Sequence, residues 1–365
     1  MRVRYIDLIT DDHYDNNHTG LGFPAASFDT NGRWFRLLAR YSLLPKERAE
    51  LWVAESETGK ADLAIVPVRI AASGQSLSAL SNFYTAYYEP WLLATDVAGL
   101  TAIVHEWATT HRYACLDFRP MDPHGFAYRQ LRHSMSAAGF ISFPYFCFGN
   151  WFLPVLNRSF RDYAASLPGK IRNTIKRKHS RFEAAGGRLD VVVGGPQLHE
   201  AIAAYQQVYA ASWKRPEPFP EFMPALMRAC AAQGWLRLGV AWLKDQPVAA
   251  QCWILYGGRA SIYKLAYDEQ FSAYSAGTLL TAHLMERALD HEGVEEVDYL
   301  AGDDPYKRDW MSGRRERWGL IGYNSRTVAG LAGLLSTGTR TIIKRLLGRS
   351  RTPAGTIINP VLAKP

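Results

Sequence analysis

The turn formed by residues 275–278, Ser-Ala-Gly-Thr, can bind an anion through its backbone. Apolar residues recur every four positions after it, at Leu280, Leu284 and Ala288, which predicts a helix that begins near residue 276. The first N–H groups of a helix lack partners within it, and the helix dipole makes that end positive. A phosphate site and an ordinary helix cap are the alternatives. The candidate phosphate-binding residues are Ser275, Gly277 and Thr278.

Acidic and basic side chains follow the predicted strand at residues 294–300. A carboxylate at a strand end can accept the proton of an attacking amine, and an ammonium or phenol can stabilise an oxyanion or protonate a leaving group. Asp303 and Asp304 are candidates for the base or for orienting Lys307, and Asp298 is a further catalytic candidate on the strand itself. Alternatively, Asp-Asp-Pro forms a simple turn that leaves Lys307 solvated. In either case we expect Lys307 in an exposed loop.

Aromatic residues alternate on the predicted strand that precedes the turn. Tyr263 and Tyr267 share one face of this strand, and Lys264 lies between them on the other. On their face the two tyrosines can line an acceptor pocket, and core packing with the hydroxyls at the rim is the alternative.

Length and composition predict a folded protein of more than one domain. The chain has 365 residues, of which 48% are hydrophobic and 13% aromatic, so two domains with separate cores are expected. The N-terminus has no apolar signal-peptide region, and no apolar run is long enough to span a membrane, which predicts a cytoplasmic location. The four cysteines are isolated and predicted to be buried free thiols, and the ten histidines form no metal motif, so no metal is expected.

The two halves of the chain show the same order of predicted elements. Three strands, a helix, a strand, and a further strand occur in each half, which predicts two tandem α/β domains with mixed sheets covered by helices. Chance recurrence of a common order is the alternative. A linker is predicted at residues 150–159. The strands are predicted at 51–56, 61–70, 77–84, 113–118, 140–149, 235–243, 247–256, 259–267, 294–300 and 318–323, and the helices at 96–111, 125–138, 197–213, 220–232 and 276–292.

The net charge of +8 is concentrated in two segments. Residues 158–188 are rich in Lys and Arg, and residues 326–365 contain basic residues but no acidic one. Such clusters attract phosphates or anionic lipids. Residues 328–347 also have near-helical apolar spacing, so they can form a basic amphipathic helix on an anionic membrane surface. The alternative is a helix that packs on its own domain.

Three patterns together resemble a known family. The Tyr-x-x-x-Tyr of Tyr263 and Tyr267, the S-A-G-T-L-L turn and the D-Y-L-x-G-D-D-P-Y-K run resemble GNAT-superfamily acyltransferases of the CelD-like group. This group is related to Fem-type aminoacyl-tRNA-dependent peptidyltransferases. The resemblance covers residues 160–323 and implies an α/β (α+β) fold of tandem GNAT-like domains, each with a mixed, mostly antiparallel sheet. The expected division is an N-terminal domain at 1–155, a catalytic domain at 156–326 and a basic tail at 327–365.

The same resemblance implies roles for individual residues. Fem-type enzymes carry a lysine in a Tyr/Phe-Lys pair after the equivalent strand, which here is Tyr306 and Lys307, so Lys307 is the first catalytic candidate. The segment 167–187 resembles the basic helix that opens the catalytic domain in these families. Its basic side chains either contact phosphates or form a solvated face. The predicted catalytic residues are Lys307, Asp303, Asp298 and Tyr267. The predicted donor-binding residues are those of the turn, Ser275, Gly277 and Thr278, together with Arg172, Lys176 and Arg177. The predicted acceptor-side residues are Trp213, Gln251, Tyr263, Lys264 and Tyr306.

The expected activity is therefore acyl transfer to an amine or hydroxyl by direct attack. Many superfamily members carry an R/Q-x-x-G-x-G/A loop, whereas this chain has Gln270 followed by the single glycine Gly277. Acyl-coenzyme A and aminoacyl-tRNA both remain open as donors, and a non-catalytic basic binding module is a third interpretation. The acceptor is expected to be a small molecule or a glycan or peptide precursor. Through its tail the protein could contact the inner face of an anionic membrane.

Overall fold

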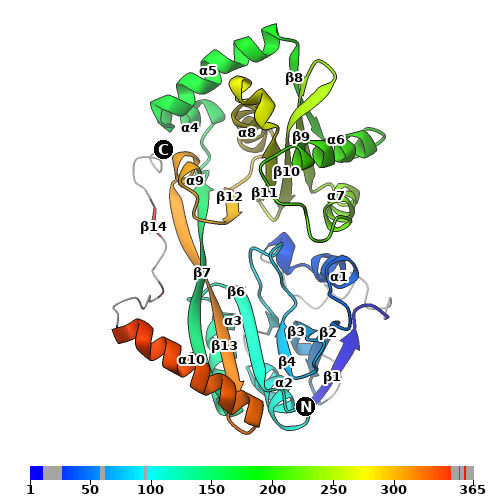
Figure 1. Cartoon of the computed structure of the whole chain (residues 1–365), viewed down its shortest axis with the longest axis vertical. Coiled ribbons are helices and arrows are strands. Elements are labelled where there is room, and N and C mark those ends of the chain that lie inside the picture. The colour runs from blue at the N-terminus through cyan, green and yellow to red at the C-terminus, as the bar shows by residue number, and fades with distance from the viewer. Residues whose placement is uncertain (11–26, 58–61, 94–96, 347–352, 354–356, 359–365) are drawn as a thin grey trace. The chain divides into compact units, whose positions relative to one another are not determined.

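The computed structural model describes residues 1–10, 27–57, 62–93, 97–346, 353 and 357–358, with side chains described up to residue 339 in the last helix. The chain forms two compact units (Figure 1). Unit 1 comprises Met1–Phe148 and Glu316–Gly355, and unit 2 comprises Gly149–Arg315 and Thr356–Pro365.

Unit 1 is built on a sheet with the strand order β1-β2-β3-β4-β6-β13-β7. Its strands β2, β3 and β4 form an antiparallel meander, and helix α2 then leads to β6, which pairs parallel to β4. The elements of unit 1 are β1 (Arg2–Asp7), η2 (Phe28–Thr30), α1 (Gly32–Tyr41), β2 (Arg48–Glu55), β3 (Asp62–Ile70), β4 (Ser76–Ala79), β5 (Trp91–Leu92), α2 (Ala98–Thr109), β6 (Cys115–Met121), α3 (Phe126–Ala137), the first part of β7 (Phe140–Pro154), the second part of β13 (Gly313–Asn324) and α10 (Val328–Leu346).

Unit 2 repeats this arrangement. Strands β9, β10 and β11 form an antiparallel meander, and helix α8 then leads to β12, which pairs parallel to β11. The elements of unit 2 are α4 (Phe160–Ser166), α5 (Gly169–Ala184), β8 (Gly187–Val192), α6 (Leu198–Ala210), α7 (Phe222–Ala232), β9 (Leu236–Leu243), β10 (Gln246–Tyr256), β11 (Arg259–Tyr267), η3 (Glu269–Tyr274), α8 (Ala276–Glu286), a π-helical turn η4 (Arg287–His291), β12 (Glu296–Ala301), α9 (Pro305–Trp310) and β14 (Ile357–Ile358), with the ends of β7 and β13 that belong to it.

The shared order of elements confirms the predicted fold class. Each unit has an antiparallel meander, a crossover helix and a parallel strand, and helices cover the mixed sheet of each. The predicted helices and strands are present, with their ends shifted by a few residues.

The compact units divide the chain differently from the predicted domains. Residues 316–326, which were assigned to the second domain, lie in unit 1 because β13 pairs there with β6 between Trp318 and Tyr323. The predicted linker at 150–159 was wrong in its first half, because β7 continues to Pro154 and pairs with β12. The final strand of each repeat therefore completes the sheet of the other unit.

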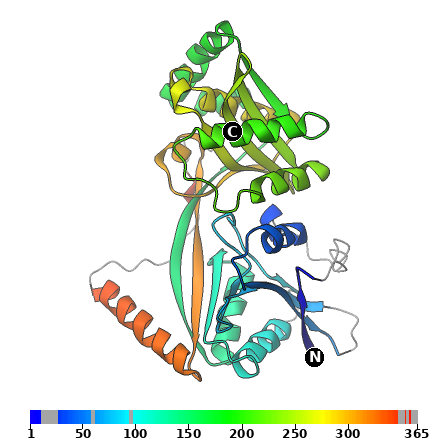
Figure 2. The same ribbon diagram turned by 45° about the vertical axis from the view of Figure 1, so that its right-hand side comes forward.

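Helices enclose the sheet of unit 2 from both faces (Figures 1 and 2). Helix α8, with α5 against it, covers one face, and α6 and α7 cover the other. The predicted core stripe of α8 is confirmed, since Leu280, Leu284 and Ala288 are all buried. Gly239 in β9 allows this close packing, because a Cβ there would lie 2.8 Å from the Cδ1 atom of Leu284. The first turn of α8 is thereby fixed over the sheet.

The cysteines differ in burial. Cys230 and Cys252 are buried free thiols as predicted, whereas Cys115 and Cys147 are only partly buried. The latter two lie on β6 and β7 at positions of intermediate burial.

Helix α10 packs one side against β13. Gly333 lies over the Tyr323 ring, so close that a Cβ there would be 2.4 Å from ring carbon Cδ1, and the Tyr323 hydroxyl hydrogen-bonds the Thr337 hydroxyl at 2.9 Å. The apolar side chains Val328, Leu331 and Leu335 are exposed. The side chains of Arg340, Lys344 and Arg345, and all of residues 347–352 and 359–365, lie outside the described part of the tail. Within the described residues, no helix combines the length and the apolar character needed to cross a membrane.

Candidate functional site

A pocket of about 470 Å³ opens in unit 2 where strands β11 and β12 separate. Their parallel pairing runs from Arg259 to Ser261, opposite Glu296 to Asp298, and no further pair joins them in the described chain. Beyond this point, β11 and β12 line the pocket together with α5, α8 and α9. The lining residues are Lys170, Ile171, Thr174, Trp213, Val248, Gln251, Leu265, Ala266, Tyr267, Asp268, Phe271, Ser272, Ser275, Ala276, Gly277, Thr278, Thr281, Tyr299, Tyr306, Asp309 and Trp310.

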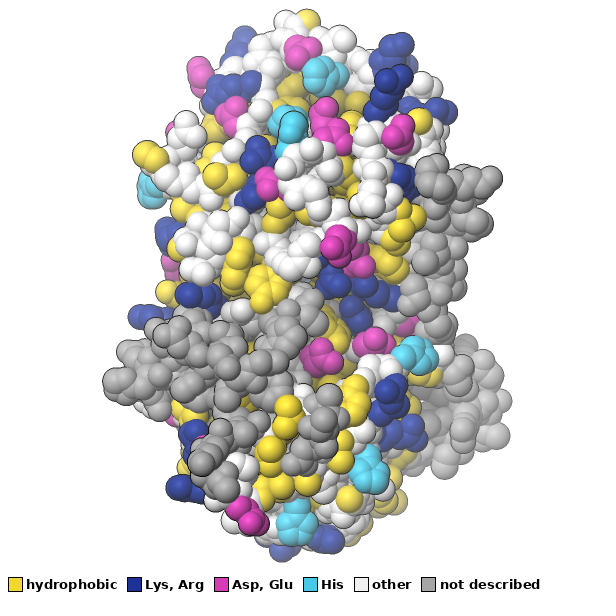
Figure 3. Space-filling view, turned by 180° about the vertical axis from the view of Figure 1, so that it is seen from behind, with side chains coloured by type: hydrophobic (Ala, Val, Ile, Leu, Met, Phe, Trp, Pro, Cys, Tyr) yellow, Lys and Arg dark blue, Asp and Glu magenta, His cyan; other side chains and the backbone are white. Residues whose placement is uncertain are grey.

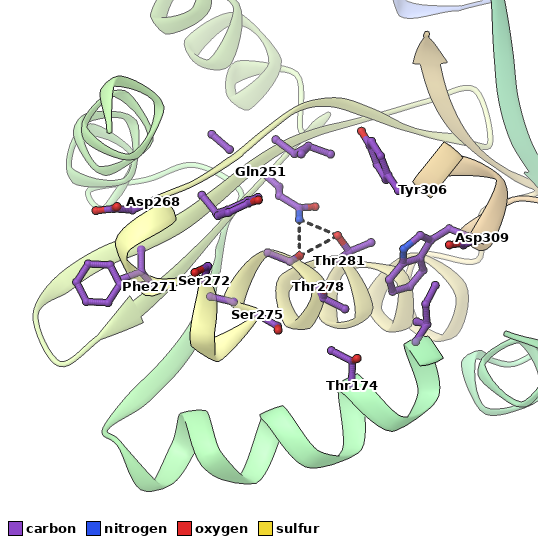
Figure 4. Close-up of a pocket in the computed structure, with 18 of the residues that line it drawn as sticks. Thr174, Gln251, Asp268, Phe271, Ser272, Ser275, Thr278, Thr281, Tyr306 and Asp309 are labelled. Carbon is purple, nitrogen blue, oxygen red and sulfur yellow. Dashed lines mark hydrogen bonds between the residues drawn. The ribbon is translucent and has the colours of Figure 1, made fainter. Parts of the chain in front are cut away.

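The predicted turn at residues 275–278 lies in this pocket (Figure 4). Ser275 has a φ of 55°, a left-handed conformation that a non-glycine residue rarely adopts, and it joins η3 to α8. Its carbonyl accepts hydrogen bonds from the N–H groups of Thr278 and Leu279. The N–H groups that precede these in α8 have no acceptor within the helix. The start of α8 thus offers donors and positive dipole charge to the pocket.

Gln251 lines the pocket, but its amide is engaged with α8. Its Nε2 atom donates to the Gly277 carbonyl at 2.9 Å and to the Thr281 hydroxyl at 2.8 Å (Figure 4). Its Oε1 atom accepts from the indole N–H of Trp253 at 2.9 Å. Gln251 therefore anchors the first turn of α8 to β10.

Helix α9 presents three side chains to the pocket, Tyr306, Asp309 and Trp310. Their i, i+3 and i+4 spacing places them on one helical face. Burial, reinforced by the nearby Asp304 carboxylate, raises the pKa of Tyr306, so its phenol stays protonated at neutral pH. The Asp309 carboxylate makes no hydrogen bond or ion pair with any described residue. This face therefore offers a proton donor beside an unengaged proton acceptor.

Lys307 is buried on another side of α9 and does not line the pocket, so the expectation of an exposed loop lysine was wrong. Its Nζ atom donates to the Ala301 carbonyl at 2.5 Å and to the Tyr299 carbonyl at 3.3 Å. Burial lowers the pKa of Lys307, and the Asp304 carboxylate 3.6 Å away opposes that change. The reason for the difference is that residues 305–310 form a helix, which turns this side chain inward toward the end of β12.

The predicted carboxylates Asp298 and Asp303 are both bound to arginines. Asp298 is buried and accepts from Arg315 at 2.5 Å, from Asn150 at 2.5 Å and from the N–H of Leu300 at 2.7 Å. Burial alone would raise the pKa of Asp298, but Arg315 and the other donors lower it overall. Asp303 is partly exposed and pairs with Arg314 at 2.7 Å. Neither carboxylate lines the pocket.

Helix α5 contributes different residues from those predicted. Lys170, Ile171 and Thr174 line the pocket, whereas the basic residues predicted to bind the donor are exposed elsewhere on α5. These are Arg172, Lys176 and Arg177.

Three of the five predicted acceptor-side residues, Trp213, Gln251 and Tyr306, line the pocket, together with the predicted catalytic Tyr267. The Trp213 and Tyr267 rings are 4.6 Å apart between centroids. Tyr263 and Lys264 do not line the pocket, and Lys264 pairs with Glu217 at 2.9 Å.

Sequence reasoning missed Asp309 and Thr174. A signal for Asp309 was present, because Pro305 after Asp304 is typical of the first residue of a helix, and a helix there places residues 306, 309 and 310 together.

Comparisons with known proteins agree with this geometry. Residues 169–308 match the family model described as acetyltransferase (GNAT) domain. No curated protein matches the chain in sequence. Among solved structures, FemX is similar at 11% identity with a TM-score of 0.61, covering 89% of this chain and 97% of FemX.

Two further structures have the same arrangement. A tandem GNAT protein from the clavulanic acid biosynthesis pathway is similar at 14% identity with a TM-score of 0.51, covering 89% of this chain and 99% of that chain. L-PGS from Bacillus licheniformis is similar at 14% identity with a TM-score of 0.50, covering 87% of this chain and 92% of L-PGS. At such identities the likeness is one of fold. The fold is therefore that of tandem GNAT domains, and the matched domain supports acyl transfer as the general activity.

Proposed function

We propose that this protein transfers an acyl group from an acyl-coenzyme A thioester to an amine or hydroxyl acceptor by direct attack. The observation that carries the proposal is the start of α8, where Ser275 and Gly277 line a pocket beside backbone donors that have no acceptor within the helix. A pyrophosphate fits such a terminus. Gly277 leaves the approach open, since the nearest atom to a Cβ built there is 3.5 Å away.

The chemistry assigns separate tasks to the two polar residues of α9. The acceptor lone pair attacks the thioester carbonyl carbon, a C–N or C–O bond forms, and the C–S bond breaks. Asp309 accepts the proton that the acceptor loses, and the Tyr306 phenol gives a proton to the departing sulfur. Proton return from Asp309 to Tyr306, through solvent, restores both groups. Beyond Ser261, the β11 N–H groups that face β12 have no strand partner among the described residues and can stabilise the oxyanion.

Lys307 acts indirectly in this scheme. By holding the carbonyls of Tyr299 and Ala301, it keeps the end of β12 bent away from β11, which keeps the pocket open. Asp298 has a similar positioning task at the last parallel pair.

Aminoacyl-tRNA is the second candidate donor, and a specific observation favours it. Arg172, Lys176 and Arg177 are exposed on α5, whose other side lines the pocket, so they suit contacts with a phosphate backbone. On the face of the molecule seen in Figure 3, basic side chains are interspersed with acidic ones. A non-catalytic module would bind either donor without turnover. Titration with acetyl-coenzyme A and with charged tRNA tests the proposal, and we expect only the thioester to bind saturably and be consumed.

We also propose that α10 contacts an anionic membrane at the inner face, where a lipid-linked glycan or peptide precursor could serve as acceptor. Its exposed Leu331 and Leu335 can enter the headgroup region, and the sequence of this segment is basic, which favours an anionic surface by about 1 kcal/mol for each Lys or Arg that comes near it. Changing both leucines to Asp should lower co-sedimentation with anionic vesicles at low salt severalfold. Both side chains are exposed, so folding should be retained. Equal pelleting of the variant and the unmodified protein would contradict the membrane contact.

A further inference from the structure

Lys214 follows Trp213 at the edge of the pocket, and no carboxylate of a described residue is in direct contact with it. Its Nζ atom is 5.7 Å from the ring centroids of both Tyr209 and Trp213. Its ammonium makes no hydrogen bond or ion pair with any residue that the structure describes. Trp213 itself lines the pocket, and its ring is tilted by 47° against the Tyr267 ring. The ammonium is therefore held between aromatic faces beside the site of transfer.

Two further lysines lie near this ammonium. Lys264 approaches the same Tyr209 ring from 6.0 Å, and its charge is paired with Glu217 at 2.9 Å. Lys307 is also near, and it is opposed by Asp304. Burial first, and then Lys264, lowers the pKa of Lys214 to about 8. Lys264 and Lys307 are thus each paired with a carboxylate, whereas Lys214 forms no ion pair with a described residue.

We propose that Lys214 binds an anionic group of the acceptor, a carboxylate or a phosphate, and so selects acidic acceptors over neutral ones. This inference rests on the proposed acyl transfer. A half-buried ammonium without a partner is unfavourable, and an anion restores the interactions that the ammonium loses with water. Because Lys214 is half-buried, water screens this attraction less than it would at a fully exposed side chain. Lysine suits this task because it binds as a compact point charge.

Matched acceptors test the selectivity. An amino acid is compared with its carboxamide, and an amino sugar phosphate with the free amino sugar, so that each pair differs only in the anionic group. We expect Lys214→Gln to raise KM for the preferred anionic acceptor about 10- to 100-fold, to leave kcat nearly unchanged, and to leave the neutral partner unaffected. The pair that shows the effect identifies carboxylate or phosphate as the group bound. Lys214→Arg should restore most of the preference.

The neighbouring exposed residue provides a control. Arg215→Gln removes one positive charge from the next position and should keep the wild-type preference. The proposal would be overturned if both variants lost the preference for the anionic acceptor equally, or if Lys214→Gln kept it.

A second measurement does not depend on turnover. Inorganic phosphate and acetate are titrated separately at constant ionic strength while the melting temperature is followed. We expect one of them to stabilise the wild type and Arg215→Gln more than Lys214→Gln. Phosphate bound at the start of α8 raises the melting temperature of all three proteins equally. A smaller rise in Lys214→Gln therefore measures anion binding at Lys214. A Lys214-dependent shift without any acyl transfer would leave the anion site standing and refute the proposed function, whereas identical shifts in all three proteins would refute the anion site.

Discussion

Asp309→Asn should lower kcat about 10²- to 10⁴-fold while the protein stays folded and binds its donor normally. Asp309 lines the pocket, and its carboxylate is not engaged by any described residue, so it can accept the acceptor's proton. Asn has nearly the same shape but cannot take up a proton. Initial rates at saturating donor, with circular dichroism and melting temperature, separate lost chemistry from lost structure.

The control is Asp245→Asn in the exposed turn between β9 and β10. It removes the same charge from the same unit and should retain the wild-type rate. A rate for Asp309→Asn within a few-fold of wild type would contradict this role, because water or another group would then accept the proton.

The second large effect is on stability. Asp298→Asn should lower the free energy of unfolding by about 1–3 kcal/mol, because Arg315 loses the buried one of its two carboxylate partners and keeps only Glu296 at 2.8 Å. The Asn150 amide also loses its charged acceptor. Denaturant unfolding at pH 7 measures the change. The matched variant Asp303→Asn breaks a partly exposed pair with Arg314 and should cost under about 1 kcal/mol.

The effect of Asp298 should depend on pH in a defined direction. Its pKa is lower in the folded protein than in the unfolded chain, where an aspartate titrates near about 3.9. Its stabilising contribution is therefore complete above that unfolded value and is lost as the pH falls through the folded pKa. The stability difference between wild type and Asp298→Asn should stay constant near neutrality and narrow below about pH 4. A constant difference down to pH 2 would contradict the paired carboxylate.

The local elements could be predicted from sequence, and the pairing of the last strands could not. The spacing of Leu280, Leu284 and Ala288 predicted α8 because a buried helix face requires that period. The repeated order of strands and helices predicted tandem units. The exchange of final strands was missed, because alternation in 318–323 shows that a strand exists without showing that its partner is β6.

The candidate site was predictable where chemistry follows from a local turn. Ser275, Gly277 and Thr278 were predicted from their position at a helix start, and the structure brings them to the pocket. Lys307 was placed wrongly because its exposure depends on α9, which the run of polar residues concealed. Lys214 was not singled out, because its surroundings come from α6, β11 and α9, which are far apart in sequence.

Donor binding with Gly277→Val tests the central claim most directly. Valine should fit the protein, since the nearest contact of a Cβ is an ordinary 3.5 Å, but its methyl groups crowd the approach of a phosphate to α8. In the control Gly338→Val, no atom of the described residues lies within 4 Å of the added Cβ. We predict that acetyl-coenzyme A raises the melting temperature of the wild type and Gly338→Val, that Gly277→Val weakens this binding at least about tenfold, and that charged tRNA has no effect. Stabilisation by charged tRNA alone, or unchanged thioester affinity in folded Gly277→Val, would contradict the account.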